Sequence, residues 1–160
     1  MVGGGRAAEL YELDAIAQVE RETSRSPDLG TVGAVGPWWN PPAYAWAFVP
    51  LAALPFGTAL LIWTALNVTA AGTAAWLLAR EVAPGSRSFA AVTALLLFSS
   101  APFLQSVTHG QNSGLSLLLV TLAVTAWRRD RSFAAGACVG LLLYKPQLAA
   151  VLAEAVALYD

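Results

Sequence analysis

The stretch FGTALLIWTALNVTAAGTAAWLLA, residues 56–79, decides the fold class. None of its 24 residues carries a charge. A helix rises 1.5 Å per residue, so this stretch reaches about 36 Å when helical. The hydrocarbon core of a bilayer is about 30 Å thick. We therefore predict a membrane-spanning helix over residues 56–79.

The composition of the whole chain supports this reading. Hydrophobic residues make up 57% of the 160 residues and charged residues 12%, whereas soluble domains carry about 25% charged residues. No Asp, Glu, Lys or Arg lies between Asp28 and Arg80, or between Arg87 and Arg128. A soluble helical bundle is the alternative, but its surface helices would each need a charged stripe, which these lack. We predict an all-α, polytopic transmembrane helical protein.

The other segments follow from the same criteria. Residues 1–41 differ from the rest, and we expect an outward-facing amphipathic helix over about 7–22 followed by a loop. Residues 42–160 form the predicted transmembrane region. Its first part is short and contains Pro50, which favours an interfacial helix. The predicted elements are an interfacial helix at 43–55 and four spans at about 56–79, 88–107, 111–127 and 132–152. The span at 88–107 is expected to bend near Pro102.

Arginines in two short loops predict the orientation. Arg80 and Arg87 lie in the 80–87 loop, and the 128–131 loop holds three more arginines. The positive-inside rule places both loops in the cytoplasm. The loop that contains His109 then faces outward. We expect a multi-pass protein of the cytoplasmic (plasma) membrane, with the lipid bilayer as a partner.

The candidate site begins in SVTHGQNSG, residues 106–114, a polar interruption between apolar runs. His109, Gln111 and Asn112 are placed at the predicted outer surface. Lys145 follows Arg131 by 14 residues, about 21 Å along a helix, which puts it in the same half of the membrane. An ionisable residue within a span is a functional candidate. A lysine there suits a phosphate, and the polar side chains suit sugar hydroxyls.

Simpler readings of these residues remain open. His109 is also explained as an ordinary loop residue, and Lys145 as an anchor that extends to the membrane surface. Gln111, Asn112 and Ser113 are expected to cap the helix that follows.

Several kinds of function are not expected. One histidine and one cysteine, Cys138, make a metal site or an internal disulfide improbable. No basic patch indicates nucleic acid, and no cofactor is expected.

Two segments resemble a known family. WWNPPAYAWAFVPLAALPFGTALLIWTALN and HGQNSGLSLLLVTLAVTAWRRDRSFAAGACVGLLLYKPQLA are similar to conserved stretches of bacterial glycosyltransferase family 87, also called DUF2029. They occur in the family's order and spacing and cover roughly residues 38–150. The specificity lies in their combination, since neither motif alone is diagnostic.

The resemblance implies a GT-C fold enzyme that uses polyprenyl-phosphate sugars, often mannose, as donors. Such enzymes transfer the sugar outside the cytoplasmic membrane to a glycolipid or cell-wall glycan. An Asp acts as general base on the acceptor hydroxyl, and the polyprenyl phosphate leaves. The expected substrate-binding residues lie within the two segments and are His109, Gln111, Asn112, Lys145, Tyr144 and Asn40.

The chain departs from the family at the catalytic Asp. In the family this Asp follows the first span and precedes the region that GGGRAAELYELDAIAQ resembles, so Asp14 is not its counterpart. The catalytic residue is unknown, and we expect a fragment, a mis-started reading frame or an inactive truncated product. The alternative function is a non-enzymatic integral membrane protein, such as a transporter subunit or structural partner.

Overall fold

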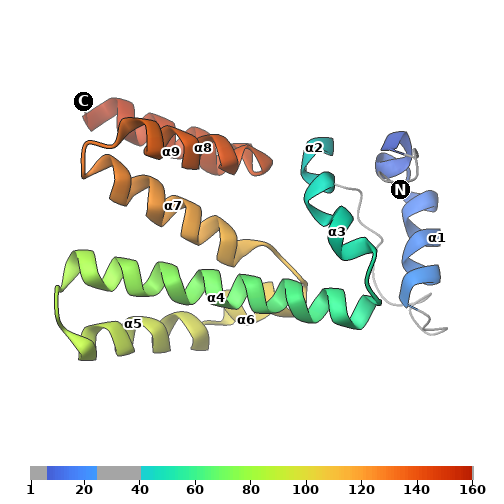
Figure 1. Ribbon diagram of the computed structural model, residues 1–160, viewed down its shortest axis with the longest axis horizontal. Coiled ribbons are helices and arrows are strands. Elements are labelled where there is room, and N and C mark those ends of the chain that lie inside the picture. The colour runs from blue at the N-terminus through green and yellow to red at the C-terminus, as the bar shows by residue number, and fades with distance from the viewer. Residues whose placement is uncertain (1–6, 25–40, 160) are drawn as a thin grey trace. The chain divides into compact units, whose positions relative to one another are not determined.

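The computed structural model describes residues 7–24 and 41–159 (Figure 1). Every element in these ranges is helical, so the all-α prediction is confirmed. The chain divides into two compact units after Ala59.

The first unit consists of short helices. η2 (Ala7–Tyr11) and α1 (Leu13–Ser24) occupy the region where one amphipathic helix over 7–22 was predicted. α2 (Pro42–Ala45), η4 (Trp46–Phe48) and α3 (Val49–Ala52) occupy the predicted interfacial helix. The rings of Tyr44 and Phe48 meet edge to face, 5.2 Å apart.

α4 (Phe56–Val82) continues into the second unit and organises it. Its 27 residues extend about 40 Å. Among the described residues it is the one unbroken helix long and apolar enough to cross a membrane. Its buried face consists of Asn67 and five alanines (Ala70, Ala71, Ala74, Ala75 and Ala79). Such small side chains allow neighbouring helices to approach closely.

The predicted span 88–107 is bent. α5 (Arg87–Ser99) and α6 (Ala101–Thr108) meet at an angle of 56°. Ser100 is extended (ψ 134°), and its hydroxyl accepts a hydrogen bond from Phe103 N–H. Pro102 lies in the first turn of α6 and has no N–H to continue the helical ladder. The bend predicted near Pro102 therefore lies two residues earlier, at the capping serine.

The last part of the chain forms shorter helices. α7 (Ser113–Trp127) is about 22 Å long. α8 (Ser132–Leu141) runs into η5 (Leu142–Tyr144), and α9 (Pro146–Tyr159) follows. α8 packs on both α7 and α9 (Figure 1). The predicted span 132–152 therefore corresponds to a helical hairpin with Lys145 at its bend.

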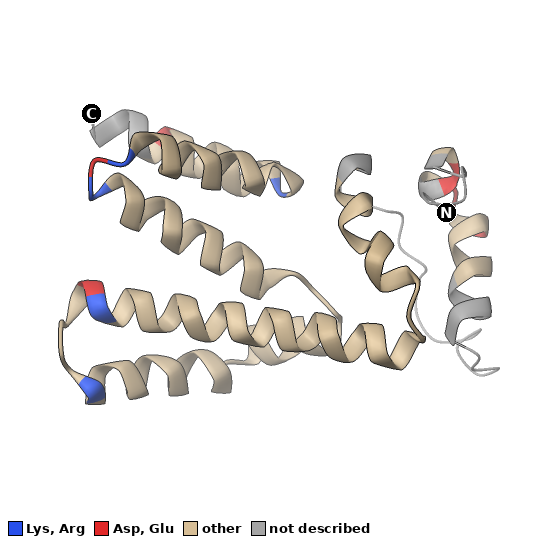
Figure 2. Cartoon of the chain, in the orientation of Figure 1, with Lys and Arg blue, Asp and Glu red and all other residues tan. Residues whose placement is uncertain are grey.

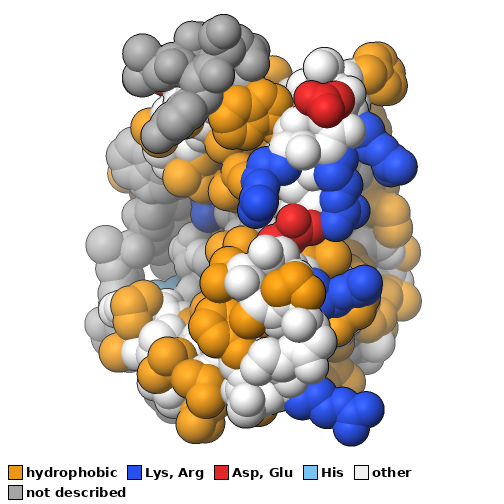
Figure 3. Space-filling model, turned by 90° about the vertical axis from the view of Figure 1, so that its left-hand side faces the viewer, with side chains coloured by type: hydrophobic (Ala, Val, Ile, Leu, Met, Phe, Trp, Pro, Cys, Tyr) orange, Lys and Arg blue, Asp and Glu red, His pale blue; other side chains and the backbone are white. Residues whose placement is uncertain are grey.

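Apart from Glu154 within α9, the described charged residues of the second unit lie at helix ends and in turns, and the lengths of α4–α8 are free of them (Figure 2). Glu81 at the end of α4 pairs with Arg129 and lies 3.7 Å from Arg128 (Nη1 to Oε2). These ion pairs bring the α4–α5 turn beside the α7–α8 turn. Figure 3 shows the resulting cluster of basic side chains around acidic ones. Both arginine turns thus lie at the same end of this unit.

Candidate functional site

The His109–Asn112 turn is held from α4 by Trp63. The indole Nε1 of Trp63 donates a hydrogen bond to the carbonyl oxygen of Gly110 at 2.8 Å. Gly110 has a left-handed backbone (φ 62°), which a glycine adopts without strain. Gln111 N–H donates to Ser106 C=O at 2.8 Å and closes the end of α6. The turn is therefore fixed both to its own helix and to α4.

Asn67 connects α4 to the start of α7. Its side chain is buried, with 4% of its surface exposed. The amide nitrogen donates to Trp63 C=O at 3.1 Å, and the amide oxygen accepts from Leu115 N–H at 3.4 Å. The first N–H groups of a helix have no partner within the helix. Asn67 therefore caps α7 from a neighbouring helix.

This finding corrects one prediction. Asn112 precedes α7, as expected of a capping residue, but its side chain makes no capping hydrogen bond. Asn112 is instead buried, and the cap reaches α7 from Asn67, 45 residues earlier in the chain. Local sequence spacing could not show this, because the partner comes from a different helix.

His109 and Gln111 lie along a hollow of about 320 Å³ beside α6. His109 is exposed, and its Nδ1 lies 2.7 Å from Gln105 C=O. A carbonyl oxygen only accepts hydrogen bonds, so Nδ1 carries the proton in this contact. In the neutral ring, Nε2 is then an acceptor, available to a hydroxyl. The exposed Gln111 adds an amide donor and acceptor to the same hollow.

Tyr144 meets the first turn of α7. Its hydroxyl lies 3.1 Å from the hydroxyl of Ser116, which also bonds to Asn112 C=O at 3.0 Å. Ser116 uses its proton on that carbonyl, so the Tyr144 hydroxyl is the donor to Ser116. This contact fastens the bend of the α8–α9 hairpin to α7.

Lys145 occupies that bend and is half-buried. The backbone N–H of Lys145 donates to Leu142 C=O at 2.7 Å, and this hydrogen bond closes the end of η5. Pro146 has no N–H, and helical bonding resumes where Leu148 N–H donates to Lys145 C=O at 2.9 Å. Because Tyr144 is fastened to Ser116, Lys145 is held near the first turn of α7.

The structure thus arranges the predicted residues in two groups. His109 and Gln111 share the hollow beside α6, while Tyr144 is joined to Asn112 through Ser116, with Lys145 next in the chain. Asn40 lies outside the described residues. Among the described residues, no three His, Cys, Asp or Glu side chains lie together as metal ligands would.

Three contributing residues were not predicted, namely Trp63, Asn67 and Ser116. Asn67 had a visible signal, because an amide in the middle of an apolar span needs a partner. Trp63 lies 18 residues before Glu81, so the turn it holds is about 27 Å along α4 from the arginine turns.

The comparisons with known proteins give one match. The sequence model of glycosyltransferase family 87 matches residues 38–158. No curated protein and no solved structure matches the chain. The matched region contains both groups of candidate residues and the whole of α4–α8.

Proposed function

The chain belongs to glycosyltransferase family 87. From this membership we propose that it transfers a hexosyl group from a polyprenyl-phosphate sugar, and we propose mannose as that sugar. The proposed acceptor is an extracytoplasmic glycolipid or cell-wall glycan. In this reaction the bond between the anomeric carbon and the phosphate oxygen breaks, and a bond to an acceptor oxygen forms. The acceptor's proton passes to a general base, for which we assign no residue of the described chain.

Within this proposal, the hydrogen bond between Tyr144 and Ser116 is the observation that supports a phosphate site at Lys145. It holds Lys145 near the first turn of α7. The N-terminus of a helix favours anions, and a lysine ammonium binds phosphate as a point charge. We assign the donor phosphate to this place. A positive charge there stabilises the polyprenyl phosphate as it leaves, when its negative charge increases.

The hollow beside α6 supports a role in sugar binding. His109 Nε2 and the Gln111 amide offer acceptors and a donor to hydroxyl groups. Trp63 keeps their turn in one position relative to α4. We assign the sugar hydroxyls to this group.

We further propose a multi-pass GT-C arrangement in the cytoplasmic membrane. The 27-residue apolar helix α4 and the membrane-associated family support membrane association. The arginine turns would face the cytoplasm, and the His109 turn the outside. That turn lies about 27 Å from the arginine turns along α4, close to the thickness of a hydrocarbon core.

The experiment uses the fact that Lys145 is the only lysine in the chain. The protein in lipid nanodiscs is treated with an amine-reactive reagent, and modification of Lys145 is read by mass spectrometry. Polyprenyl-phosphate mannose and polyprenyl phosphate are expected to protect Lys145, because both place a phosphate against its ammonium. Polyprenol, which lacks the phosphate, serves as the control ligand.

Substitution gives the second arm. Lys145→Gln is expected to weaken binding of labelled polyprenyl-phosphate mannose by about tenfold, the loss of one charge-assisted hydrogen bond. Lys145→Arg should retain most of the binding, because it keeps the charge. Full modification of Lys145 at saturating donor, or equal protection by polyprenol, would contradict the phosphate site.

A further inference from the structure

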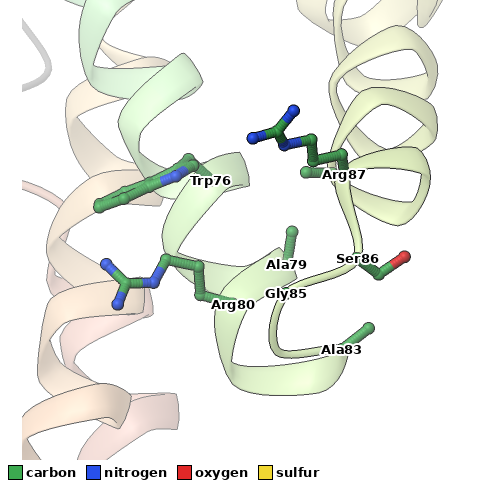
Figure 4. A pocket seen from close by; sticks show the side chains of 8 residues that line it. Trp76, Ala79, Arg80, Ala83, Gly85, Ser86 and Arg87 are labelled. Atoms are coloured by element: carbon green, nitrogen blue, oxygen red, sulfur yellow. The ribbon is translucent and has the colours of Figure 1, made fainter.

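A second hollow, of about 470 Å³, lies where α4 ends and α5 begins. Trp76 and Arg80 project from α4, and Arg87 projects from the start of α5 (Figure 4). Small residues, including Ala79 and Gly85, form the rest of the lining. Arg80 and Arg87 therefore both line this hollow, and none of its described lining residues is acidic.

The nearest carboxylate in the sequence does not neutralise these arginines. Glu81 follows Arg80 directly, but its side chain pairs with Arg128 and Arg129 from the α7–α8 turn. Arg80 instead stacks on Trp76, with its Cζ 4.7 Å from the ring centroid. A guanidinium held over an aromatic face loses less freedom when it binds an anion, and its N–H groups at the edge remain available.

The backbone adds to the positive character of the hollow. Ser86 caps α5, and its hydroxyl accepts from Phe89 N–H at 3.3 Å. α5 therefore begins at Arg87, and its N-terminus lies along the hollow that Arg80 and Arg87 line. The partial positive charge of a helix N-terminus acts in the same direction as their guanidinium groups.

We propose that this hollow binds the phosphate of an anionic phospholipid headgroup. An arginine guanidinium binds phosphate oxygens in a bidentate manner. Trp76, half exposed beside Arg80, has the amphipathic character of residues at the membrane–water interface. The apolar length of α4 continues from this level, so acyl chains have a surface to follow. The cytoplasmic leaflet, to which the arginine turns are assigned, is rich in anionic lipid.

This site is separate from the proposed transfer site. Arg80 lies 17 residues after Trp63, about 25 Å along α4 from the turn that Trp63 holds. Loss of lipid binding here and loss of donor binding at Lys145 are therefore distinguishable. The role we infer is to hold the α4–α5 turn at one depth in the membrane.

The test is retention of lipid by the full chain, purified and measured by native mass spectrometry after exchange into mixed phosphatidylglycerol and phosphatidylcholine. The wild-type protein should retain phosphatidylglycerol preferentially. Arg80→Gln with Arg87→Gln is expected to lower that preference by tenfold or more, as two charge-assisted hydrogen bonds are lost. Arg131→Gln removes a charge from the neighbouring turn, outside the hollow. This variant should change the preference for phosphatidylglycerol by less than about twofold.

A second arm separates the sources of phosphate. Glycerol phosphate at millimolar concentration is added to the lipid-bound protein. If glycerol phosphate displaces the lipid, the hollow recognises the phosphate group alone, whether free or in a headgroup. If the lipid is retained, its acyl chains contribute to binding as well. Equal losses in the double variant and in Arg131→Gln, or no preference in the folded wild type, would overturn the proposal. Folding of each variant is checked from its helical circular dichroism and melting temperature.

Discussion

Gly114 lies directly against the backbone of Asn67. A Cβ atom at position 114 would be 2.1 Å from the carbonyl oxygen of Asn67 and 2.8 Å from its carbonyl carbon. Atoms do not approach this closely, so glycine is what allows α7 to cross α4 here. The crossing also brings Leu115 N–H within reach of the Asn67 side chain. The close approach of the two helices and the cap of α7 are therefore one feature.

Gly114→Ala should destabilise the second unit. The obstructing atoms belong to the backbone, so a helix must shift, and such overpacking costs about 1–3 kcal/mol. Thermal unfolding in detergent, followed by circular dichroism, measures the loss. Gly136→Ala is the matched control, because a Cβ there meets nothing within 4 Å. A melting temperature for Gly114→Ala equal to that of the control would show that the helices do not cross this closely.

Asn67→Ala should loosen the start of α7 without separating the helices. It removes the acceptor for Leu115 N–H, and the loss of such a cap costs about 1 kcal/mol. Faster hydrogen exchange in residues 113–116 is the expected signature. Thr73→Ala on the same helix is the control, because the Thr73 hydroxyl bonds only within α4, to Thr69 C=O. Unchanged exchange in the first turn of α7 would exclude the cap.

The sequence predicted helices well where composition alone determines them. The uncharged stretch 56–79 forms all but the last three residues of α4, and Pro102 correctly indicated a bend nearby. The helical hairpin at Lys145 was not predicted, because an apolar run does not reveal where a chain turns back. Pro146 was the available signal, since it interrupts the backbone ladder at that point.

Only part of the candidate site could be predicted, because the sequence shows its polar residues but not the residues that hold them in place. The polar turn at His109 and the isolated Lys145 are visible in any reading of charge and hydropathy. The residues that hold them, Trp63 and Ser116, look like ordinary members of apolar helices. Their role depends on contacts between residues far apart in the chain, and hydropathy carries no information about those contacts.

Trp63→Phe should release the His109 turn. The substitution keeps an aromatic ring but removes the N–H that bonds to Gly110 C=O at 2.8 Å. The expected cost is about 1 kcal/mol, with faster hydrogen exchange confined to residues 109–112. Trp76→Phe changes a tryptophan on the same helix at the distant end and serves as the control. If Trp63→Phe, like the control, leaves hydrogen exchange in residues 109–112 unchanged, the Trp63 indole does not hold this turn.

The contact between Tyr144 and Ser116 is best tested as a pair. Tyr144→Phe and Ser116→Ala each remove one side of the 3.1 Å hydrogen bond. If this bond positions Lys145, each variant should weaken protection of Lys145 by polyprenyl phosphate. The double variant should then lose little more than either single one, with a coupling of about 0.5–1.5 kcal/mol in the affinity for polyprenyl phosphate. Thr121→Ala, one to two turns further along α7, is the control, since its hydroxyl bonds to Leu117 C=O within the helix. Additive effects would mean that Tyr144 and Ser116 act separately, and the link between the hairpin bend and α7 would then not be what places the lysine.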